Sequence, residues 1–147
     1  METEVVPKER ELLNTTATHS FTVFPEDMNY AGALFGGKIL AEIDIAAIKA
    51  VRRMMYYTDC NAAVTASIDR VDFLNPASLG DIIELTARIY KLGKTSVGVF
   101  VHVTRENHQG QIDTICDASL VFVTLKDGKP HPHNHSLKKL NSNNIDD

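Results

Sequence analysis

Cysteine is scarce in this sequence: Cys60 and Cys116 are the only two, and they form no CxxC pair. Two cysteines cannot form the disulfide framework that small secreted domains use. The N-terminus is acidic, and no apolar run follows it as in a secretory signal. We therefore expect free thiols, most simply buried as small apolar groups, in a protein of the reducing cytoplasm.

Long apolar runs and an excess of positive charge are also missing. No stretch reaches the ~18 uninterrupted apolar residues of a membrane-spanning helix, because Glu42, Asp44 and Lys49 interrupt the most apolar helical segment. The 15 Lys and Arg against 19 Asp and Glu give a formal net charge of −4, which supplies no bulk field for nucleic acid. We expect neither a membrane nor a nucleic acid as a partner.

What the sequence does contain is enough for one globular domain. Its 147 residues are 44% hydrophobic and 23% charged, which is the balance of ordinary soluble domains. Both ends are polar. We therefore expect an N-terminal arm over 1–18, a folded domain over 19–128, and a polar tail over 129–147 that is disordered or loosely docked.

Periodicity predicts one long helix among strands. Over 36–57, apolar residues recur at spacings of three and four; they are Leu40, Ile43, Ala47, Ala50 and Met54. Alternation predicts strands over 20–24, 62–73, 81–91, 95–105 and 113–125, and the second changes its apolar side midway, which suggests a bulge or burial on both faces. Short turns make neighbouring strands antiparallel, so we expect an α+β fold whose sheet curls around the helix and whose open edges favour a homodimer.

One residue breaks the helical pattern. The neighbours of Asp44 three and four positions away are all apolar, whereas Glu42 has Lys38 one turn back and can form an ordinary surface pair. Aspartate is also unfavourable inside a helix. A carboxylate placed in this way is a candidate functional group, although it could also lie at the solvent edge or cap a loop.

Glycines gather immediately before this helix. Asn29, Gly32, Gly36 and Gly37 fall within nine residues. Glycine permits close approach of the backbone to a ligand, and the first N–H groups of a helix lack intrahelical acceptors and lie at the positive end of its dipole. They could bind an oxyanion, or the pair could simply form a loop.

At this point the sequence resembles the hotdog-fold acyl-CoA thioesterases. The resemblance lies in Asn29, Gly32, the triplet Phe35-Gly36-Gly37, and Asp44 two turns into the helix. It continues through segments 63–65, 73–76, 80–81 and 93–96, and it covers about residues 19–126. The combination is specific, although each motif alone is weak.

The resemblance implies a long antiparallel sheet wrapped around a central α-helix. It also implies dimers whose sheets join, assembled further into a hexamer, with active sites at the dimer interface. The implied reaction is hydrolysis of fatty acyl-CoA to a free acid and coenzyme A, with no metal or prosthetic group.

Site roles also follow from the resemblance. Asp44 is implied as the acidic catalytic residue and Asn29 as its polar partner, while the N–H of Gly37, with that of Gly36, would polarise the thioester carbonyl. Thr65 would lie near the reacting centre. The coenzyme A moiety would contact Lys94, Thr95 and Ser96.

The sequence leaves several alternatives open. Asp44 could deprotonate water or attack the carbonyl itself to form an anhydride, and Asn29 could orient either the water or the carbonyl. Arg52 and Arg53, near the helix end, could serve the nucleotide, but they also suit the helix dipole. His131, His133 and His135 alternate without an acidic or cysteine partner nearby in the sequence, so we expect no metal site.

Two rival functions remain. A hotdog hydratase or dehydratase would resemble a different pattern, with a catalytic histidine before the helix, and segment 25–35 contains none. A non-enzymatic acyl-CoA sensor would need an output domain, for which we expect no room. It would also not need both Asn29 and Asp44.

Overall fold

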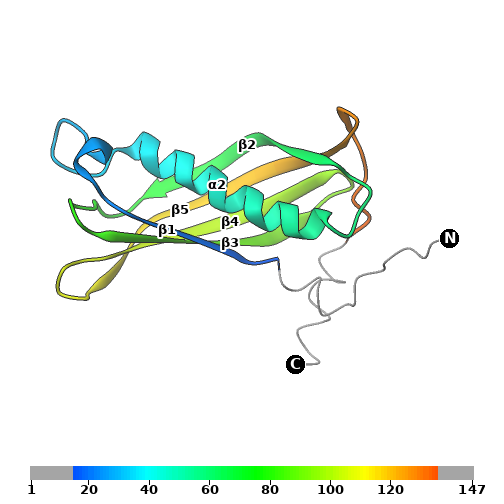
Figure 1. Ribbon diagram of the computed structural model, residues 1–147. Helices are drawn as coiled ribbons and strands as arrows, with labels where there is room; N and C mark the ends of the chain where they lie inside the picture. The colour runs from blue at the N-terminus through cyan, green and yellow to red at the C-terminus, as the bar shows by residue number, and fades with distance from the viewer. Residues whose placement is uncertain (1–14, 136–147) are drawn as a thin grey trace, which may run out of the picture.

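The computed structural model describes residues 15–135. One long helix, α2 (Gly36–Met55), lies along one face of an antiparallel sheet (Figure 1). The sheet has the strand order β1-β3-β4-β5-β2, and a short strand, β6, pairs with β5. The predicted α+β fold, with one helix on a long antiparallel sheet, is confirmed.

The five predicted strands occur in the predicted order, and β6, which was not predicted, follows them. The strands are β1 (Ala17–Thr22), β2 (Ala62–Phe73), β3 (Ile82–Leu92), β4 (Ser96–Glu106), β5 (Ile112–Lys126) and β6 (Lys129–Pro130), with a 3-10 turn, η1 (Pro25–Asp27), after β1. Three residues separate β3 from β4, as expected for a hairpin. The long strands lie side by side beneath the helix (Figure 1).

The first strand begins earlier than predicted, at Ala17 instead of residue 20, so part of the expected N-terminal arm belongs to the sheet. Ala17–Thr22 pairs in register with residues 87–82 of β3. The N–H of Val23 still donates to the Asp81 carbonyl at 2.9 Å. The bounds of β1 are therefore set by its pairing with β3. Alternation of apolar residues in so short a segment could not predict them. Residues 15 and 16 of the predicted arm precede the strand, and residues 1–14 lie outside the described residues.

The helix buries a wider face than its apolar stripe predicted. Leu40, placed in that stripe, is only half-buried, whereas Ile39 is 5% exposed. The fully buried partners on this face include Ile43, Ala47 and Met54. A sheet that curves around the helix also contacts its flanks, so residues beside the stripe become core.

The predicted bulge lies in β2. The pairing of β2 with β5 shifts register between Thr65 and Ser67, and again between Ile68 and Arg70. Simple alternation would put Val64 and Ile68 on the same face of the sheet. This prediction is wrong, because the register shift after Thr65 moves the side chains that follow it to the opposite face. The same shift leaves Thr65 on the face that carries the helix.

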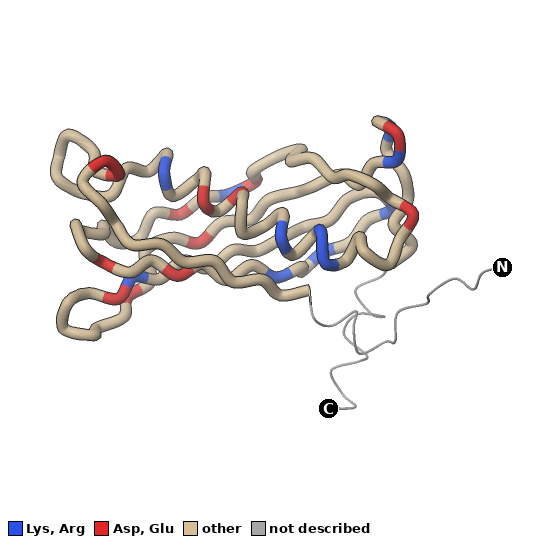
Figure 2. Tube along the Cα trace, in the orientation of Figure 1, with Lys and Arg blue, Asp and Glu red and all other residues tan. Residues whose placement is uncertain are grey.

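Charged groups are distributed unevenly along the helix. Figure 2 shows basic positions near both ends of α2 and acidic ones between them. Arg52 and Arg53 occupy its last turn, where they complement the helix dipole. Arg53 also donates to the Thr16 carbonyl, ahead of β1, so this arginine has a structural role.

Candidate active site

Asp44 and Thr65 meet between the helix and the edge strand of the sheet. The Thr65 hydroxyl donates to Asp44 Oδ1 at 2.6 Å. Within residues 15–135, the other carboxylate oxygen of Asp44 has no protein partner. The carboxylate is therefore fixed by one oxygen and free to act through the other.

The two glycines at the helix start present free donors. The N–H groups of Lys38 and Ile39 donate to the Phe35 carbonyl, at 3.0 and 3.3 Å. Neither Gly36 nor Gly37 donates to any acceptor in the described part of the chain. A Cβ on Gly37 would come within 2.4 Å of the Phe35 ring, so glycine fits this close approach.

Asn29 holds the loop before the helix in shape. Its side-chain oxygen accepts from the backbone N–H groups of Ala31 and Ala33, at 2.9 and 3.1 Å. The backbone N–H of Asn29 donates to the Ala33 carbonyl at 2.7 Å. Gly32, at φ +83°, completes the turn. Because the oxygen is occupied, the amide nitrogen of Asn29 is the group left to a ligand, and only as a donor.

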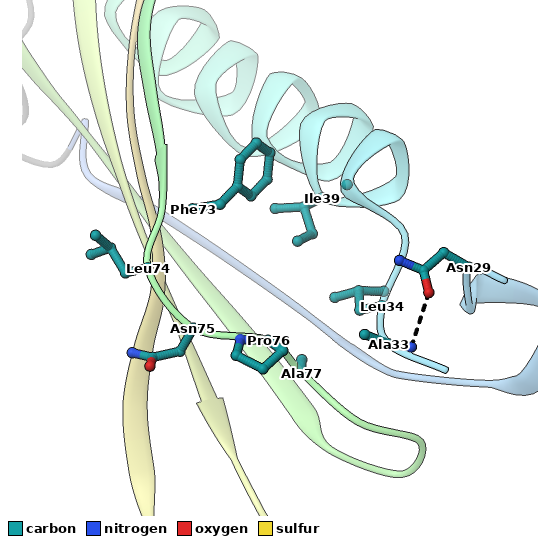
Figure 3. A pocket seen from close by; sticks show the side chains of 10 residues that line it. Asn29, Ala33, Leu34, Ile39, Phe73, Leu74, Asn75, Pro76 and Ala77 are labelled. Atoms are coloured by element: carbon teal, nitrogen blue, oxygen red, sulfur yellow. Dashed lines mark hydrogen bonds between the residues drawn. The ribbon is translucent and has the colours of Figure 1, made fainter. Parts of the chain in front are cut away.

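A pocket of about 360 Å³ opens beside these groups (Figure 3). Asn29 and Gly36 contribute to one wall, and residues 73–77, at the end of β2 and just after it, form the other. The Phe73 ring and the Ile39 side chain face the space between helix and strand (Figure 3). Segment 73–76 is among the segments of the resemblance, but the sequence predicted no role for it at a pocket. In the structure, the apolar Phe73 and Leu74 are each 53% exposed, which is consistent with a ligand-facing surface.

The two halves of the site do not meet within one chain. Asp44 follows Gly37 by seven helical residues, which corresponds to ~10 Å along the axis. Asp44 and Thr65 are accordingly absent from the pocket lining. The structure thus brings Asp44 to Thr65 and Asn29 to Gly36, and it leaves these two pairs apart.

Glu42 differs from its prediction as an ordinary surface residue. It is 9% exposed, and its carboxylate contacts Lys38 Nζ at 3.0 Å and also the ring of His19 on β1. Burial alone raises the pKa of Glu42, but the hydrogen bonds from Lys38 and His19 outweigh it and lower the pKa. The hydrogen bond to Glu42 in turn raises the pKa of Lys38. Lys38 also reaches Asp27 at 3.6 Å, which ties the helix start to the segment before Asn29.

The predicted coenzyme A residues lie at the other end of the sheet. Lys94 and Thr95 belong to the connection between β3 and β4, and Ser96 begins β4. Lys94 is exposed and forms no ion pair within residues 15–135. Its ammonium is therefore available to an anion. The geometry does not bring this turn to the pocket within one chain.

Two further features complete the description. Across residues 15–135, no three His, Cys, Asp or Glu side chains are arranged to hold a metal ion, and His131, His133 and His135 form no such group. No helix in that part of the chain is long and apolar enough to span a membrane.

Comparison with known proteins assigns the family. A model of the thioesterase superfamily matches residues 31–111. An uncharacterised acyl-CoA thioester hydrolase of Bacillus subtilis (strain 168) is 38% identical over 129 residues, which cover 86% of this chain and 72% of the relative.

Solved structures agree with this result. The acyl-CoA hydrolase of Staphylococcus aureus, in complex with butyryl coenzyme A, coenzyme A and coenzyme A disulfide, matches with a TM-score of 0.75 and 32% identity, over 82% of this chain and 73% of that one. A hexameric hotdog fold thioesterase of Campylobacter jejuni matches with a TM-score of 0.72 and 31% identity, over 88% of this chain and 96% of that one. This chain belongs to the thioesterase superfamily and has the hotdog fold of acyl-CoA thioesterases.

Proposed function

We propose that this protein hydrolyses fatty acyl-CoA thioesters to a free fatty acid and coenzyme A. The observation that carries the proposal is the half-engaged carboxylate of Asp44, held by Thr65 at the sheet edge, together with the unused N–H donors at the start of the same helix. The names of the similar proteins support the substrate class. The Staphylococcus aureus hydrolase has also been solved with alanine in place of an aspartate, a threonine or an asparagine, the residue types proposed here.

The donors suit the charge that develops in thioester hydrolysis. Attack on the carbonyl carbon produces a tetrahedral oxyanion, which preorganised N–H groups at a helix N-terminus stabilise. Gly37 and Gly36 supply such groups, and the amide nitrogen of Asn29 supplies a further donor. Because its oxygen closes the loop, Asn29 orients the carbonyl and does not accept from the water.

Asp44 acts on the water in this mechanism. Its free oxygen takes a proton from water as the water oxygen bonds to the carbonyl carbon. The tetrahedral intermediate then expels the coenzyme A thiolate as the C–S bond breaks. Asp44 returns its proton to the sulfur, and the fatty acid leaves. These groups supply both the base and the oxyanion donors, so the mechanism uses no metal or prosthetic group.

A second copy of the chain completes the site. The outer edge of β2 pairs with nothing in the described residues, and Val64 and Ile68 on this strand are 48% and 44% exposed. An exposed strand edge of twelve residues is a template for another strand. We propose an antiparallel dimer through β2 that sets the Asn29 and Gly37 donors of one protomer opposite Asp44 of the other. We also propose a trimer of such dimers, for which the support is that the similar thioesterase of Campylobacter jejuni is hexameric.

The remaining assignments concern coenzyme A and the compartment. The exposed Lys94 ammonium suits a phosphate group, and Thr95 and Ser96 add hydroxyl groups beside it. Both cysteines are free, in keeping with the proposed location in the cytoplasm.

A thiol-release assay tests the proposal. Purified protein is given saturated acyl-CoAs of two to eighteen carbons in the presence of EDTA, as wild type, Asp44→Ala and Asp44→Asn. We expect release by the wild type and a loss of ~100-fold or more in both variants. Asp113→Asn, which removes an exposed carboxylate paired with Arg105, is the matched control and should keep the wild-type rate.

Two outcomes would contradict the proposal. Binding of acyl-CoA without thiol release at any chain length would make the protein a binding module. Full activity in the Asp44 variants would exclude this carboxylate from the chemistry. Reduction with borohydride during turnover separates the two routes for Asp44, because only an anhydride intermediate is converted at that residue to homoserine.

A further inference from the structure

The C-terminal strap, residues 129–135, is the segment whose contacts the proposed mechanism does not use. It leaves β5 through a tight turn at Asp127 and Gly128, both at positive φ. The His131 N–H then donates to the Thr124 carbonyl at 2.9 Å, and the Thr124 hydroxyl donates back to the His131 carbonyl at 2.7 Å. The sequence predicted a tail over 129–147 that is disordered or loosely docked, but 129–135 is held by paired hydrogen bonds, and 136–147 lies outside the described residues.

The strap is also attached at the loop after the helix. His131 Nε2 contacts Asp59 Oδ1 at 2.9 Å. The Cys60 thiol lies 3.5 and 3.6 Å from the carbonyl oxygens of His131 and Pro132, and Cys60 is 8% exposed. The strap therefore covers this thiol, and solvent access to Cys60 reports whether the strap is docked.

His133 joins the strap to the β3–β4 turn. His133 is 2% exposed, and its ring has Nε2 3.1 Å from the Ser96 carbonyl and Nδ1 accepting from the His135 N–H at 3.0 Å. A carbonyl only accepts and an amide N–H only donates, so in this arrangement Nε2 is the donor of the ring and Nδ1 is its acceptor. The His133 N–H also donates to the Lys94 carbonyl at 3.3 Å.

Hydrogen bonds hold the carbonyls of Lys94, Thr95 and Ser96. The Thr95 carbonyl accepts from the Thr124 N–H of β5 at 2.8 Å, and the Lys94 carbonyl accepts from the His133 N–H of the strap. The Ser96 carbonyl contacts the His133 ring and also accepts from the Gly93 N–H at 3.0 Å. With its backbone fixed in this way, the turn presents the exposed and unpaired Lys94 side chain outward. A loop held in one conformation binds a ligand with less entropic loss than a mobile one.

We propose that His133 is a positioning residue, through which the C-terminal strap holds the Lys94–Ser96 turn in the conformation that binds the phosphate-bearing nucleotide of coenzyme A. The inference rests on the proposed function, because it assumes that this turn meets the substrate. His133 and the strap act through the turn and touch no reacting atom. The expected effect is therefore on substrate binding and not on the chemical step.

The test compares His133→Ala, which removes both ring contacts, with His133→Gln, which keeps a donor for the Ser96 carbonyl. We expect His133→Ala to raise KM for acyl-CoA about tenfold, the loss from one or two neutral hydrogen bonds, with kcat within twofold of wild type. His133→Gln should recover most of this loss. The matched control is His108→Ala, an exposed histidine outside the strap and the turn.

A truncated substrate isolates the nucleotide. S-acyl-pantetheine has the same thioester but no adenine nucleotide, so KM for this compound should be the same for wild type and His133→Ala. An equal rise in KM for both substrates would overturn the inference, because the strap would then affect another part of the site. An unchanged KM for acyl-CoA would overturn it as well.

Thiol labelling separates local release of the strap from unfolding. Cys60 should react faster with a thiol reagent in His133→Ala than in wild type. Burial raises the pKa of Cys116 to about 11, and Asp117 and Asp72 add to the shift, so Cys116 stays unlabelled unless the protein unfolds. Faster labelling of Cys60 without a change in KM would mean that the strap is only structural.

A failure of the proposed function can be distinguished from a failure of this inference. If wild type releases no thiol from any acyl-CoA, the hydrolase proposal is wrong, and the affinity for coenzyme A itself is measured by calorimetry. A roughly tenfold weaker Kd in His133→Ala would still support the positioning role. An unchanged Kd would overturn it.

Discussion

The Thr65 hydroxyl and Asp44 Oδ1 lie 2.6 Å apart, and this contact joins the middle of α2 to the open edge strand β2. Aspartate has two carboxylate oxygens with distinct surroundings here, because threonine fixes one and nothing in the described chain engages the other. In the proposed mechanism, this pair sets the direction in which the carboxylate faces the attacking water.

Replacing Thr65 should lower activity without removing it. Thr65→Val keeps the shape but leaves Asp44 Oδ1 without its donor, and a hydrogen bond to a charged group contributes ~1.5–3 kcal/mol. We expect kcat to fall about 10- to 100-fold, and Thr65→Ser to restore most of it. Steady-state kinetics measures this, and equal rates in the valine and serine variants would show that the hydroxyl has no role.

Two substitutions of Asn29 separate its effect on stability from its effect on catalysis. Asn29→Asp keeps an oxygen to accept from Ala31 and Ala33 but removes the amide donor, whereas Asn29→Ala removes both. We expect the aspartate variant to melt near the wild-type temperature and to lose ~100–1,000-fold in kcat, as for loss of one oxyanion donor. The alanine variant should lose stability as well.

Calorimetry and kinetics on the two Asn29 variants give the answer together. A fully active Asn29→Asp would show that the amide donates nothing to the transition state. Its side chain would then serve only to close the loop.

The sequence was most informative where local chemistry decides the structure. The helix start at Gly36 and the antiparallel order of the strands follow from glycine placement, alternation and short turns. Asp44 was also identifiable, because a carboxylate among apolar neighbours has no local reason to be there. Its contact with Thr65 is now observed, while the catalytic roles of both residues stay predictions.

Tertiary contacts explain what the sequence did not predict. The Lys38–Glu42 spacing fits a surface pair, and only the approach of His19 from β1 buries it. The role of Phe73 at the pocket depends on where β2 ends relative to the helix. The docking of His133 depends on a turn 37 residues away in the chain. None of these pairings has a local pattern.

Glu42 should make the free energy of unfolding depend on pH in the acidic range. Its pKa is lowered in the folded protein, so its contribution is complete above the unfolded value of about 4.3 and is lost as the pH falls through the lower folded value. Glu42→Gln should reduce the free energy of unfolding at pH 7 by about 1.5–3 kcal/mol. The difference from wild type should shrink below about pH 4.3.

Urea unfolding of wild type and Glu42→Gln from pH 7 to pH 3 measures this dependence. Glu84→Gln is the control, because Glu84 is exposed and unpaired within the described residues, and it should show no such difference. A constant difference across the pH range would mean that the Lys38 and His19 contacts add no net stability in the charged state.

The dimer proposal predicts that two inactive variants complement each other and recover activity when they form mixed dimers. Asn29→Asp retains Asp44, and Asp44→Asn retains Asn29. If each site combines residues of two protomers, a mixed dimer has one site with both native residues and one with neither. Half of the dimers are mixed after random exchange, so we expect about a quarter of the wild-type activity from a refolded equimolar mixture.

The same mixture distinguishes the alternative arrangement. If Asn29 and Asp44 of one protomer acted on the same substrate, every site would carry one defect and the mixture would remain inactive. Ile68→Lys provides the second arm, since a buried charge at the joined β2 edges should dissociate the dimer and abolish activity together. An active monomer of Ile68→Lys, found by light scattering and thiol release, would contradict the shared site, because one chain holds Gly37 and Asp44 ~10 Å apart along α2.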